Sequence, residues 1–228
     1  MKQETNMEDS QENDQFTAGF LHRSIKNLKL NSVLVCSPNH KKSKQVYTEF
    51  VKLNETEDLG VKIILMPVHA TSTQKSKIIH TIDSGEKVVI FQVRVFSLGT
   101  DIPRLESVMV VGNRSSQIDI VQTCSRALRT HPDKKKAYIL IPYLVQNNFE
   151  EEGNYSNVRK VIRAMGSVDE AVFETVFDQR IGKHRSRGRE IIFMGENWID
   201  GVCEKRLENF EVEIYNRFGE IDEISVKI

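Results

Sequence analysis

Three polar side chains at helical spacing are the strongest candidates for chemistry in this sequence: Gln122, Arg126 and Arg129. At about 100° per residue they share one side of a helix predicted over residues 117–129. The other side collects residues that suit a buried face: Ile120, Val121, Cys124, Ala127 and Leu128. A guanidinium suits phosphate because it donates two parallel hydrogen bonds and stays charged. Two arginines on one rigid helix can stabilise a phosphoryl group in transfer. For the stripe alone, an exposed face with ordinary charges is the competing interpretation.

The elements that must position this helix alternate between strands and helices. Further helices are predicted over residues 20–30 and around two apolar triplets, Val46, Phe50, Leu53 and Ile78, Ile79, Ile82. Apolar, β-rich runs predict five strands, at residues 32–36, 61–66, 87–93, 106–111 and 135–143. Continuous apolar strands that alternate with helices indicate a parallel sheet covered on both faces. Such a doubly wound α/β domain carries its functional loops at the carboxyl ends of the strands.

Charge is unevenly distributed along the chain. Residues 1–15 carry one basic and five acidic side chains, and we expect them to form a disordered acidic tail. Residues 16–145 carry 19 basic and 10 acidic side chains and form the predicted α/β domain. Residues 146–228 carry 12 basic and 17 acidic side chains and are predicted to be a small helical or mixed extension. The middle block is therefore the part expected to contact a polyanion.

Several classes of protein are not favoured by the composition. No segment approaches the roughly 20 apolar residues that span a bilayer, and the polar N-terminus lacks the apolar core of a signal peptide. We therefore expect an intracellular protein, cytoplasmic or nuclear, with no membrane partner. Cys36, Cys124 and Cys203 are too far apart in sequence to suggest a disulfide framework or a zinc site. No metal site is predicted.

Two segments together resemble the C-terminal lobe of superfamily 2 helicases. The run from Gln122 to Arg129 resembles motif VI of that family, Q-x-x-G-R-x-x-R. Upstream, the run from Gly99 to Pro103 resembles the G-x-D-I-P core of motif V, and one predicted strand separates the two. Weaker matches are residues 33–37 to motif IV, His69-Ala70 to a His-Gly pair, and Ser84-Gly85 to an S/N-G pair. The run with Val93-Arg94 and residues 116–122 is most similar to the restriction-enzyme-like branch.

The resemblance implies a RecA-like fold and a set of site residues. Arg126 and Arg129 would reach the γ-phosphate of ATP held on another lobe, with Arg129 as the arginine finger. Gln122 would lie at the same cleft, Gly99 would allow close backbone approach, and Asp101 would bind the ribose or orient the arginines. Nucleic-acid contacts are implied for a further set of residues: Ser37, His69, Thr71 and Arg94. A basic loop at residues 182–190 is another candidate for phosphate contact.

The sequence departs from the family pattern in two ways. Ser125 and Ala70 stand where the family has Gly, and Val93 stands where many relatives have a Thr that contacts nucleic acid. No G-x-x-x-x-G-K-[ST] phosphate loop and no D-E-x-[DH] run occurs in the 228 residues. ATP and Mg²⁺ are therefore expected only through an N-terminal lobe outside this sequence, and no stand-alone ATPase activity is expected.

Two functions follow from these observations. The first is half of a motor, a fragment or separately encoded lobe that works on DNA or RNA with an ATP-binding lobe, fused or separate. The second is a decayed lobe that binds nucleic acid or protein without ATPase activity. The intact Gln122, Arg126 and Arg129 favour the first, whereas Ser125 favours the second. A nuclease or methyltransferase finds no support, because neither a metal-binding carboxylate cluster nor a G-x-G cofactor loop is present.

Overall fold

The structure, a computed structural model, describes residues 2–93, 95, 102–112, 116–142 and 156–168. The chain divides into two compact units, residues 1–161 and residues 162–228, and each is treated by itself. Most of the extension predicted over residues 146–228, including its basic loop, lies outside the described residues. Within the part that is described, no helix is long and apolar enough to cross a membrane.

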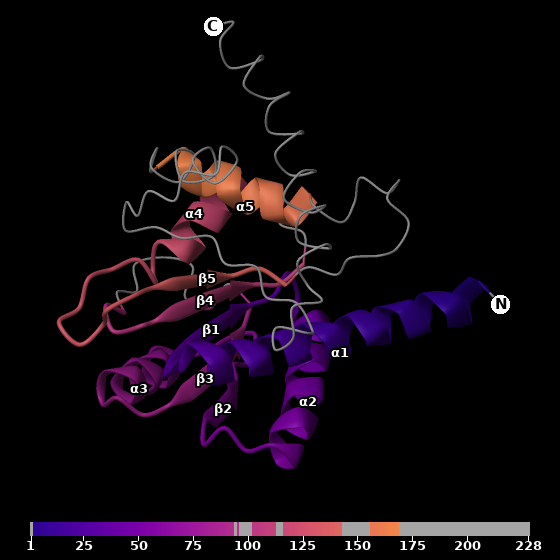
Figure 1. The fold of residues 1–228 in the computed structure, drawn as a ribbon, viewed down its shortest axis with the longest axis horizontal. Helices are drawn as coiled ribbons and strands as arrows, with labels where there is room; N and C mark the ends of the chain where they lie inside the picture. Colours follow the sequence, from indigo (N-terminus) through magenta and orange to yellow (C-terminus); the bar gives the residue numbers. More distant parts are fainter. Residues whose placement is uncertain (1, 94, 96–101, 113–115, 143–155, 169–228) are drawn as a thin grey trace, which may run out of the picture. The chain divides into compact units, whose positions relative to one another are not determined.

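Five parallel strands form one sheet at the centre of the first unit (Figure 1). They are β1 (Ser32–Cys36), β2 (Lys62–Leu65), β3 (Val88–Gln92), β4 (Ser107–Val110) and β5 (Tyr138–Leu140). Their order in the sheet is β2-β3-β1-β4-β5, and every neighbouring pair is parallel. Each strand lies inside one of the five runs predicted from sequence, so the predicted α/β fold with a parallel sheet is confirmed.

Burial follows position in the sheet. Every residue of β1, β3 and β4 is buried, whereas β2 and β5, at the two edges, are partly exposed. The three inner strands are covered on both faces, and this is why most of their residues are Val, Ile, Leu, Met or Phe. Continuous apolar runs in the sequence therefore indicate which strands lie in the interior of the sheet.

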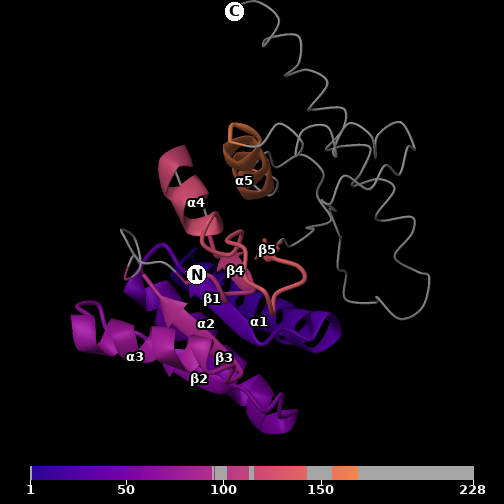
Figure 2. The same ribbon diagram turned by 90° about the vertical axis from the view of Figure 1, so that its left-hand side faces the viewer.

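Helices cover both faces of this sheet. The helices of the first unit are α1 (Lys2–Leu28), α2 (His40–Thr56), α3 (Ser72–Asp83) and α4 (Gln117–Cys124). α2 packs on β2 and β3, and α1 packs along α2. Figure 2 shows α1 and α3 on opposite sides of the sheet. This arrangement follows from right-handed crossovers, because the chain moves from β1 outward to β2 through α2 and returns to β3 through α3.

A fifth helix, α5 (Ser156–Gly166), spans the division between the two units in the sequence. Its apolar side chains recur at helical spacing and are buried: Val158, Val161, Ile162, Ala164 and Met165. Of the helical or mixed extension predicted over residues 146–228, the structure describes residues 156–168, which are helical up to Gly166.

The first helix is longer than the sequence indicated. A short helix was predicted over residues 20–30 behind a disordered tail at residues 1–15, whereas α1 begins at Lys2. The Asp14 side chain, inside the predicted tail, is buried and forms an ion pair with Lys42 of α2. Further along α1, Ala18, Leu21 and Ile25 are buried. Composition indicates disorder here because the stabilising contacts come from α2, which is distant in sequence.

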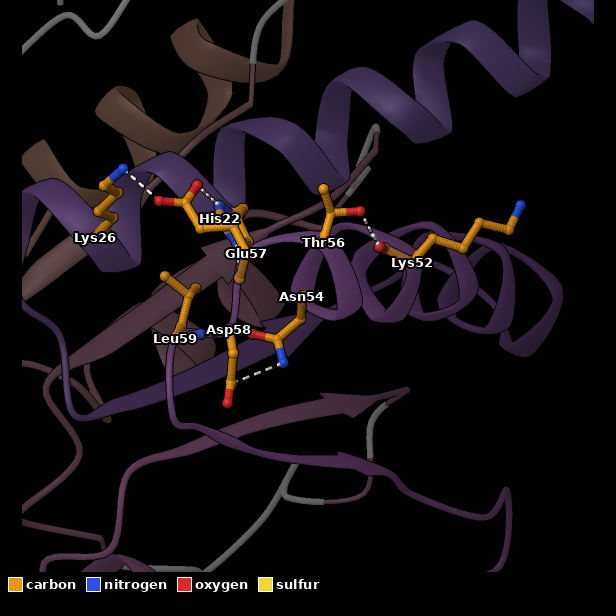
Figure 3. Close-up of polar contacts among 8 residues, drawn as sticks. All are labelled: His22, Lys26, Lys52, Asn54, Thr56, Glu57, Asp58 and Leu59. Atoms are coloured by element: carbon orange, nitrogen blue, oxygen red, sulfur yellow. Dashed lines mark hydrogen bonds and ion pairs between the residues drawn. The ribbon is translucent and has the colours of Figure 1, made fainter.

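A polar cluster holds the end of α2 against α1 (Figure 3). The buried ring of His22 places Nε2 2.9 Å from the backbone oxygen of Glu57, and Lys26 pairs with the Glu57 carboxylate. The hydrogen bond from Lys26 lowers the pKa of Glu57 below its usual value of 4.5, and the positive charge of Lys26 and the His22 ring act in the same direction. The half-exposed Glu57 therefore favours the folded state only while it is ionised.

The depressed pKa of Glu57 predicts a pH-dependent contribution to stability. A carboxyl whose pKa is lower in the folded state stabilises the fold above its unfolded pKa, and this contribution disappears as the pH falls through the folded value. Glu57→Gln should therefore lower the urea midpoint at about pH 7, and the variant and wild type should converge below pH 4.5. Glu55→Gln, an exposed control on the same helix, should match wild type throughout. A Glu57→Gln deficit that persists unchanged into acid would contradict the proposed ion pair.

Two glycines with left-handed backbone conformation permit a second prediction. Gly112, directly beyond β4, has φ of 71°, and an added Cβ would lie 3.1 Å from Cγ of Pro38. Gly60 has φ of 63°, but a Cβ there would meet nothing within 4 Å. Alanine at either site carries the left-handed penalty of about 1–2 kcal/mol. Gly112→Ala should be the more destabilising of the two in urea unfolding, because Pro38 must also move. Equal losses of stability in the two variants would show that Pro38 moves aside at no cost in free energy.

Candidate functional site

The carboxyl ends of the parallel strands meet at one edge of the sheet, where the sequence placed the functional loops. Just beyond β1, the backbone nitrogen of Ser37 donates to Gln92 at the end of β3, at 3.1 Å. The backbone nitrogen of Val111, after β4, donates to Cys36 at 3.0 Å. The hydrogen bonding between neighbouring strands thus continues one residue past the ends of β1 and β4. Loops that are distant in sequence leave the sheet side by side, at the point where the α2 and α4 crossovers diverge.

Gln92 fixes the first residues of the loop that leads toward motif V. Its side chain is buried, its amide nitrogen lies against Sγ of Cys36, and its side-chain oxygen accepts a hydrogen bond of 2.8 Å from the backbone nitrogen of Val95. A buried amide is costly unless its donors and acceptors are satisfied. Here they are satisfied by the neighbouring strand and by the loop. Sequence analysis missed this role because Gln92 lies within an apolar run that indicated only a strand.

The predicted nucleic-acid contacts are placed differently from one another. Ser37 is only 1% exposed, and its hydroxyl has no hydrogen-bond partner among the described residues. His69 is exposed in the turn after β2. Thr71 is the N-cap of α3. The Thr71 hydroxyl accepts a hydrogen bond from the Gln74 backbone nitrogen at 3.2 Å, and the Gln74 side-chain oxygen accepts one from the Thr71 backbone nitrogen at 2.9 Å. Thr71 therefore has a structural role that the family pattern did not indicate.

Part of the predicted motif V lies outside the described residues. These are Arg94, Gly99 and Asp101, so their roles in binding nucleic acid and nucleotide stay predictions. The described residues that follow are well placed in the fold: Ile102 and Leu105 are buried, and the chain enters β4 at Ser107. The described residues on either side are held within the domain, Val95 by its hydrogen bond to Gln92 and Leu105 by burial.

α4 carries Gln122 and leads into the two arginines, but it is shorter than the predicted helix. Ser116 caps its start by accepting a hydrogen bond from the Asp119 backbone nitrogen at 3.3 Å. The helix ends at Cys124 rather than at residue 129. Beyond it, Ala127 donates to Cys124 and Leu128 donates to Ser125, at 3.1 and 3.2 Å, which are bonds closed over three residues. The Ser125 hydroxyl also donates to the Gln122 oxygen at 3.2 Å, and such back-bonding bends or ends helices.

The tighter turn corrects the buried face predicted for this segment. Bonds closed over three residues advance the chain by about 120° per residue, against about 100° in an α-helix. Ala127 then lies directly in line with Cys124, and both are fully buried with Ile120. Leu128, predicted to be buried with them, is instead rotated away and is 46% exposed. The prediction for Leu128 was wrong because it assumed that the α-helix continued.

The two arginines lie on the side away from this buried face. Gln122 and Arg129 are exposed, and Arg126 is half-buried. With about 120° per residue, positions 126 and 129 fall on the same side of the turn. Both arginines therefore belong to this turn, and their direction relative to Gln122 differs from that expected in a continuous helix. This pair is suited to an anionic ligand approaching from outside the domain.

The segment after the arginines holds two residues, Asp133 and Lys134, that sequence analysis did not single out. Lys134 Nζ donates to three backbone oxygens, of Pro103, Leu105 and Ala127, at 2.7, 3.0 and 2.9 Å. Burial lowers the pKa of Lys134 from its ordinary value, and the carboxylate of Glu106 opposes this effect. Arg104 pairs with Asp133 at 3.3 Å. In sequence, Lys134 is the first of three consecutive lysines, and nothing there separates it from its neighbours.

The remaining chemistry in the described residues is limited. No group of three His, Cys, Asp or Glu side chains among them is arranged to hold a metal ion. Cys36 and Cys124 are buried thiols, and neither is in a disulfide. The site consists of strand-end loops, the N-terminus of α3 and the arginine-bearing turn after α4.

Comparison with known proteins agrees with this architecture. Residues 17–131 match the family described as the helicase conserved C-terminal domain. Probable helicases from two isolates of African swine fever virus, one from a Kenyan pig and one from a Malawian tick, are each 28% identical over 152 residues. The match covers 65% of this chain and 17% of each viral protein. The chain therefore corresponds to a small part of those proteins.

A solved structure shares the fold over most of the chain. The ATP-dependent Type ISP restriction-modification enzyme LlaBIII, solved bound to DNA, is similar with a TM-score of 0.71 and 21% sequence identity. The similarity covers 90% of this chain and 15% of that enzyme. Since the family match spans half of the chain and the parallel sheet has the expected architecture, this chain belongs to the helicase conserved C-terminal domain family.

Proposed function

We propose that this domain is the second lobe of an ATP-driven nucleic-acid motor and that it supplies arginines to ATP bound elsewhere. The observation that supports the proposal is the turn after α4, which holds Arg126 and Arg129 between α4 and β5 and leaves Arg129 exposed. A planar guanidinium that stays charged can stabilise the charge on a phosphoryl group in transfer. Arg129, the more exposed of the two, is the proposed arginine finger, and Gln122 on the preceding helix would lie at the same cleft, as the resemblance implies.

The nucleotide itself would be held by a different lobe. The 228 residues contain neither a phosphate loop nor the acidic run that holds Mg²⁺ in such motors. We therefore infer an N-terminal lobe, fused or separate, that binds ATP and Mg²⁺ across the cleft from the arginine-bearing turn. Gly99 and Asp101 would complete the nucleotide side of this domain, as the motif V resemblance implies.

Nucleic acid is the proposed substrate at the strand-end loops. Residues 16–145 carry 19 basic and 10 acidic side chains, which favours an anionic partner. The exposed His69 and the N-terminus of α3 lie at the end of β2 and can approach a phosphate backbone. Arg94 belongs to the same group of candidates. Ser37 is buried, so the contact proposed there would use the strand-end backbone region or require exposure of its side chain. The DNA-bound state of LlaBIII is in line with this partner class.

A binding module without ATPase activity is the competing function, and Ser125 is the observation that favours it. This residue replaces the family's Gly, and its hydroxyl is occupied by the oxygen of Gln122. The hydroxymethyl group adds bulk where a nucleotide would approach. The two functions differ in one measurable property, since only the motor loses turnover when Arg129 is changed.

Arg129→Lys tests the arginine finger directly. The chain would be joined to a superfamily 2 N-terminal lobe that carries a phosphate loop and a D-E-x-H run, and steady-state ATPase activity would be measured with saturating nucleic acid. Arginine fingers contribute about 10³–10⁵ in turnover, and an ammonium cannot reproduce the planar fork. We expect most of the turnover to be lost with little change in ATP affinity or melting temperature.

Two controls accompany this measurement. The unpartnered chain should show no nucleic-acid-stimulated ATP turnover, and Arg163→Lys, an exposed arginine on α5, should leave the activity of the joined protein unchanged. Wild-type turnover in Arg129→Lys would remove Arg129 from catalysis and favour the binding module. Turnover by the unpartnered chain that Arg129→Ala abolishes would contradict the need for a second lobe.

Salt dependence tests the nucleic-acid contacts. Binding through phosphates releases counterions, so the logarithm of the binding constant should fall linearly with the logarithm of salt, by about 0.9 per contact on duplex DNA. With only a few contacts the isolated chain should bind weakly, and His69→Ala should reduce both affinity and slope. Fluorescence anisotropy with labelled DNA and RNA of unrelated sequences would measure this. Binding that is insensitive to salt, or confined to one sequence, would contradict phosphate contacts.

A further inference from the structure

We infer that Lys134 is a positioning residue that sets the place of the arginine segment, residues 125–130, relative to the loop at residues 103–105. Its ammonium group bridges the two, since it donates to Ala127 in the arginine segment and to Pro103 and Leu105 in the loop. The loop follows motif V directly, so one side chain connects the two segments that would meet the nucleotide. The catalytic consequence rests on the proposed function, whereas the connection itself does not.

Every N–H donor of the Lys134 ammonium group has an acceptor. An ammonium group has three N–H donors, and the three oxygens lie at 2.7, 3.0 and 2.9 Å, so each donor has one acceptor. A neutral amine has only two donors and would leave one carbonyl without a partner. Hydrogen bonds from a charged donor are about twice as strong as those between neutral groups. These bonds offset the cost of withdrawing part of the charge from water, which burial imposes on Lys134.

Lys134 acts on peptide groups that are already held on their other side. The oxygen of Ala127 belongs to the same planar peptide group as the nitrogen of Leu128, which donates to Ser125 at 3.2 Å. The oxygen of Leu105 shares its peptide group with the nitrogen of Glu106, which donates to the Ser32 hydroxyl at 2.9 Å. A peptide plane bonded at both its N–H and its C=O has little freedom to rotate. The Lys134 contact thereby transmits the rigidity of the sheet to the arginine segment.

The arginine segment depends on such a contact because α4 has ended before it. The last carbonyls of a helix lack intrahelical N–H donors, and a cation at this end is favourable. Beyond Cys124 the turn is held by bonds closed over three residues, whose geometry is weaker than that of an α-helix. Ala127 lies between the two arginine positions, so a bond to its oxygen restrains both. A shift of about 1 Å in a catalytic group can cost about 10²-fold in rate.

Lys134 is itself held in place by its surroundings. Its backbone nitrogen donates to the oxygen of His131 at 3.0 Å, which closes a turn before β5. The neighbouring Asp133 pairs with Arg104 at 3.3 Å, and Arg104 also donates to the oxygen of Asp83 at the end of α3, at 2.6 Å. The turn at residues 131–134 is therefore fixed to two other parts of the domain. Consequently the ammonium group meets the carbonyls from a defined direction.

Amide hydrogen exchange in the full 228-residue chain tests the inference without nucleotide. Lys134→Met keeps the length of the side chain but removes every donor, and Lys135→Met is the matched control at an exposed neighbour. Exchange at the Leu128 and Glu106 amides should rise at least about tenfold in Lys134→Met, because their peptide groups lose one of two anchors. The strand amides of Val89 and Ile90 should be unchanged, and Lys135→Met should match wild type at every site.

Either of two results would overturn the inference. One is unchanged exchange at Leu128 in Lys134→Met. The other is an equal rise at Leu128 and at the strand amides, which would mean that Lys134 supports global stability instead of this segment. If Lys134→Met fails to fold, Lys134→Arg replaces it with Lys135→Arg as control. A planar fork cannot direct three donors to three converging carbonyls, so faster exchange at Leu128 is again expected, and its absence is again decisive.

Turnover in the joined motor separates this inference from the proposed function. Lys134→Met should lower kcat for ATP with little change in KM, because the arginines would act only in the transition state. If Arg129→Lys retains full turnover, the proposed function fails while the exchange result still decides the role of Lys134. If Leu128 exchange is unaffected by Lys134→Met, the inference fails and the arginine finger can still stand.

Discussion

β1 is hydrogen-bonded on both edges and buried on both faces, and most of the domain depends on this position. Its five residues pair in register with β3 on one side, and four of them pair with β4 on the other. The chain must then leave β1 in one direction, through α2, and leave β4 in the other, through α4. Right-handed crossovers place the helices on both faces. The carboxyl ends of β1 and β4 consequently flank a point where loops diverge, and these loops carry the candidate site.

The same constraint explains how much of the fold was visible in the sequence. A strand buried on both faces is apolar along its length, so β1, β3 and β4 appeared as continuous runs. Local signals did not determine the helix ends. α1 extends over an acidic stretch because Asp14 is paired with Lys42 and its apolar residues are covered by α2, contacts between positions far apart in sequence. Propensity is a weak guide wherever such tertiary contacts decide the outcome.

The candidate site was predictable as a set of residue types and less so as a geometry. The family pattern pointed to Gln122, Arg126 and Arg129, and in the structure the two arginines follow α4 in a turn. The family pattern did not show that α4 ends at Cys124, because the end of the helix depends on the Ser125 hydroxyl and on bonds closed over three residues. Thr71 shows the converse, since a residue assigned to ligand contact serves as a helix cap. Lys134 was invisible, because its partners are backbone oxygens and these have no side-chain signature.

These features assign different tasks to exposed and half-buried cations. Arg129 is exposed, and in the proposed motor its guanidinium would meet a ligand held by another lobe. Lys134 is partly desolvated and spends its three donors within the domain. When an exposed arginine binds a ligand, ordering its side chain and the backbone that carries it costs conformational entropy. Restraining the backbone of the arginine segment in advance, through the Ala127 carbonyl, removes the backbone part of this cost. The flexible Arg129 side chain is therefore carried by a backbone segment that is held in place. The group that holds it is the Lys134 ammonium, which is hydrogen-bonded to three peptide groups.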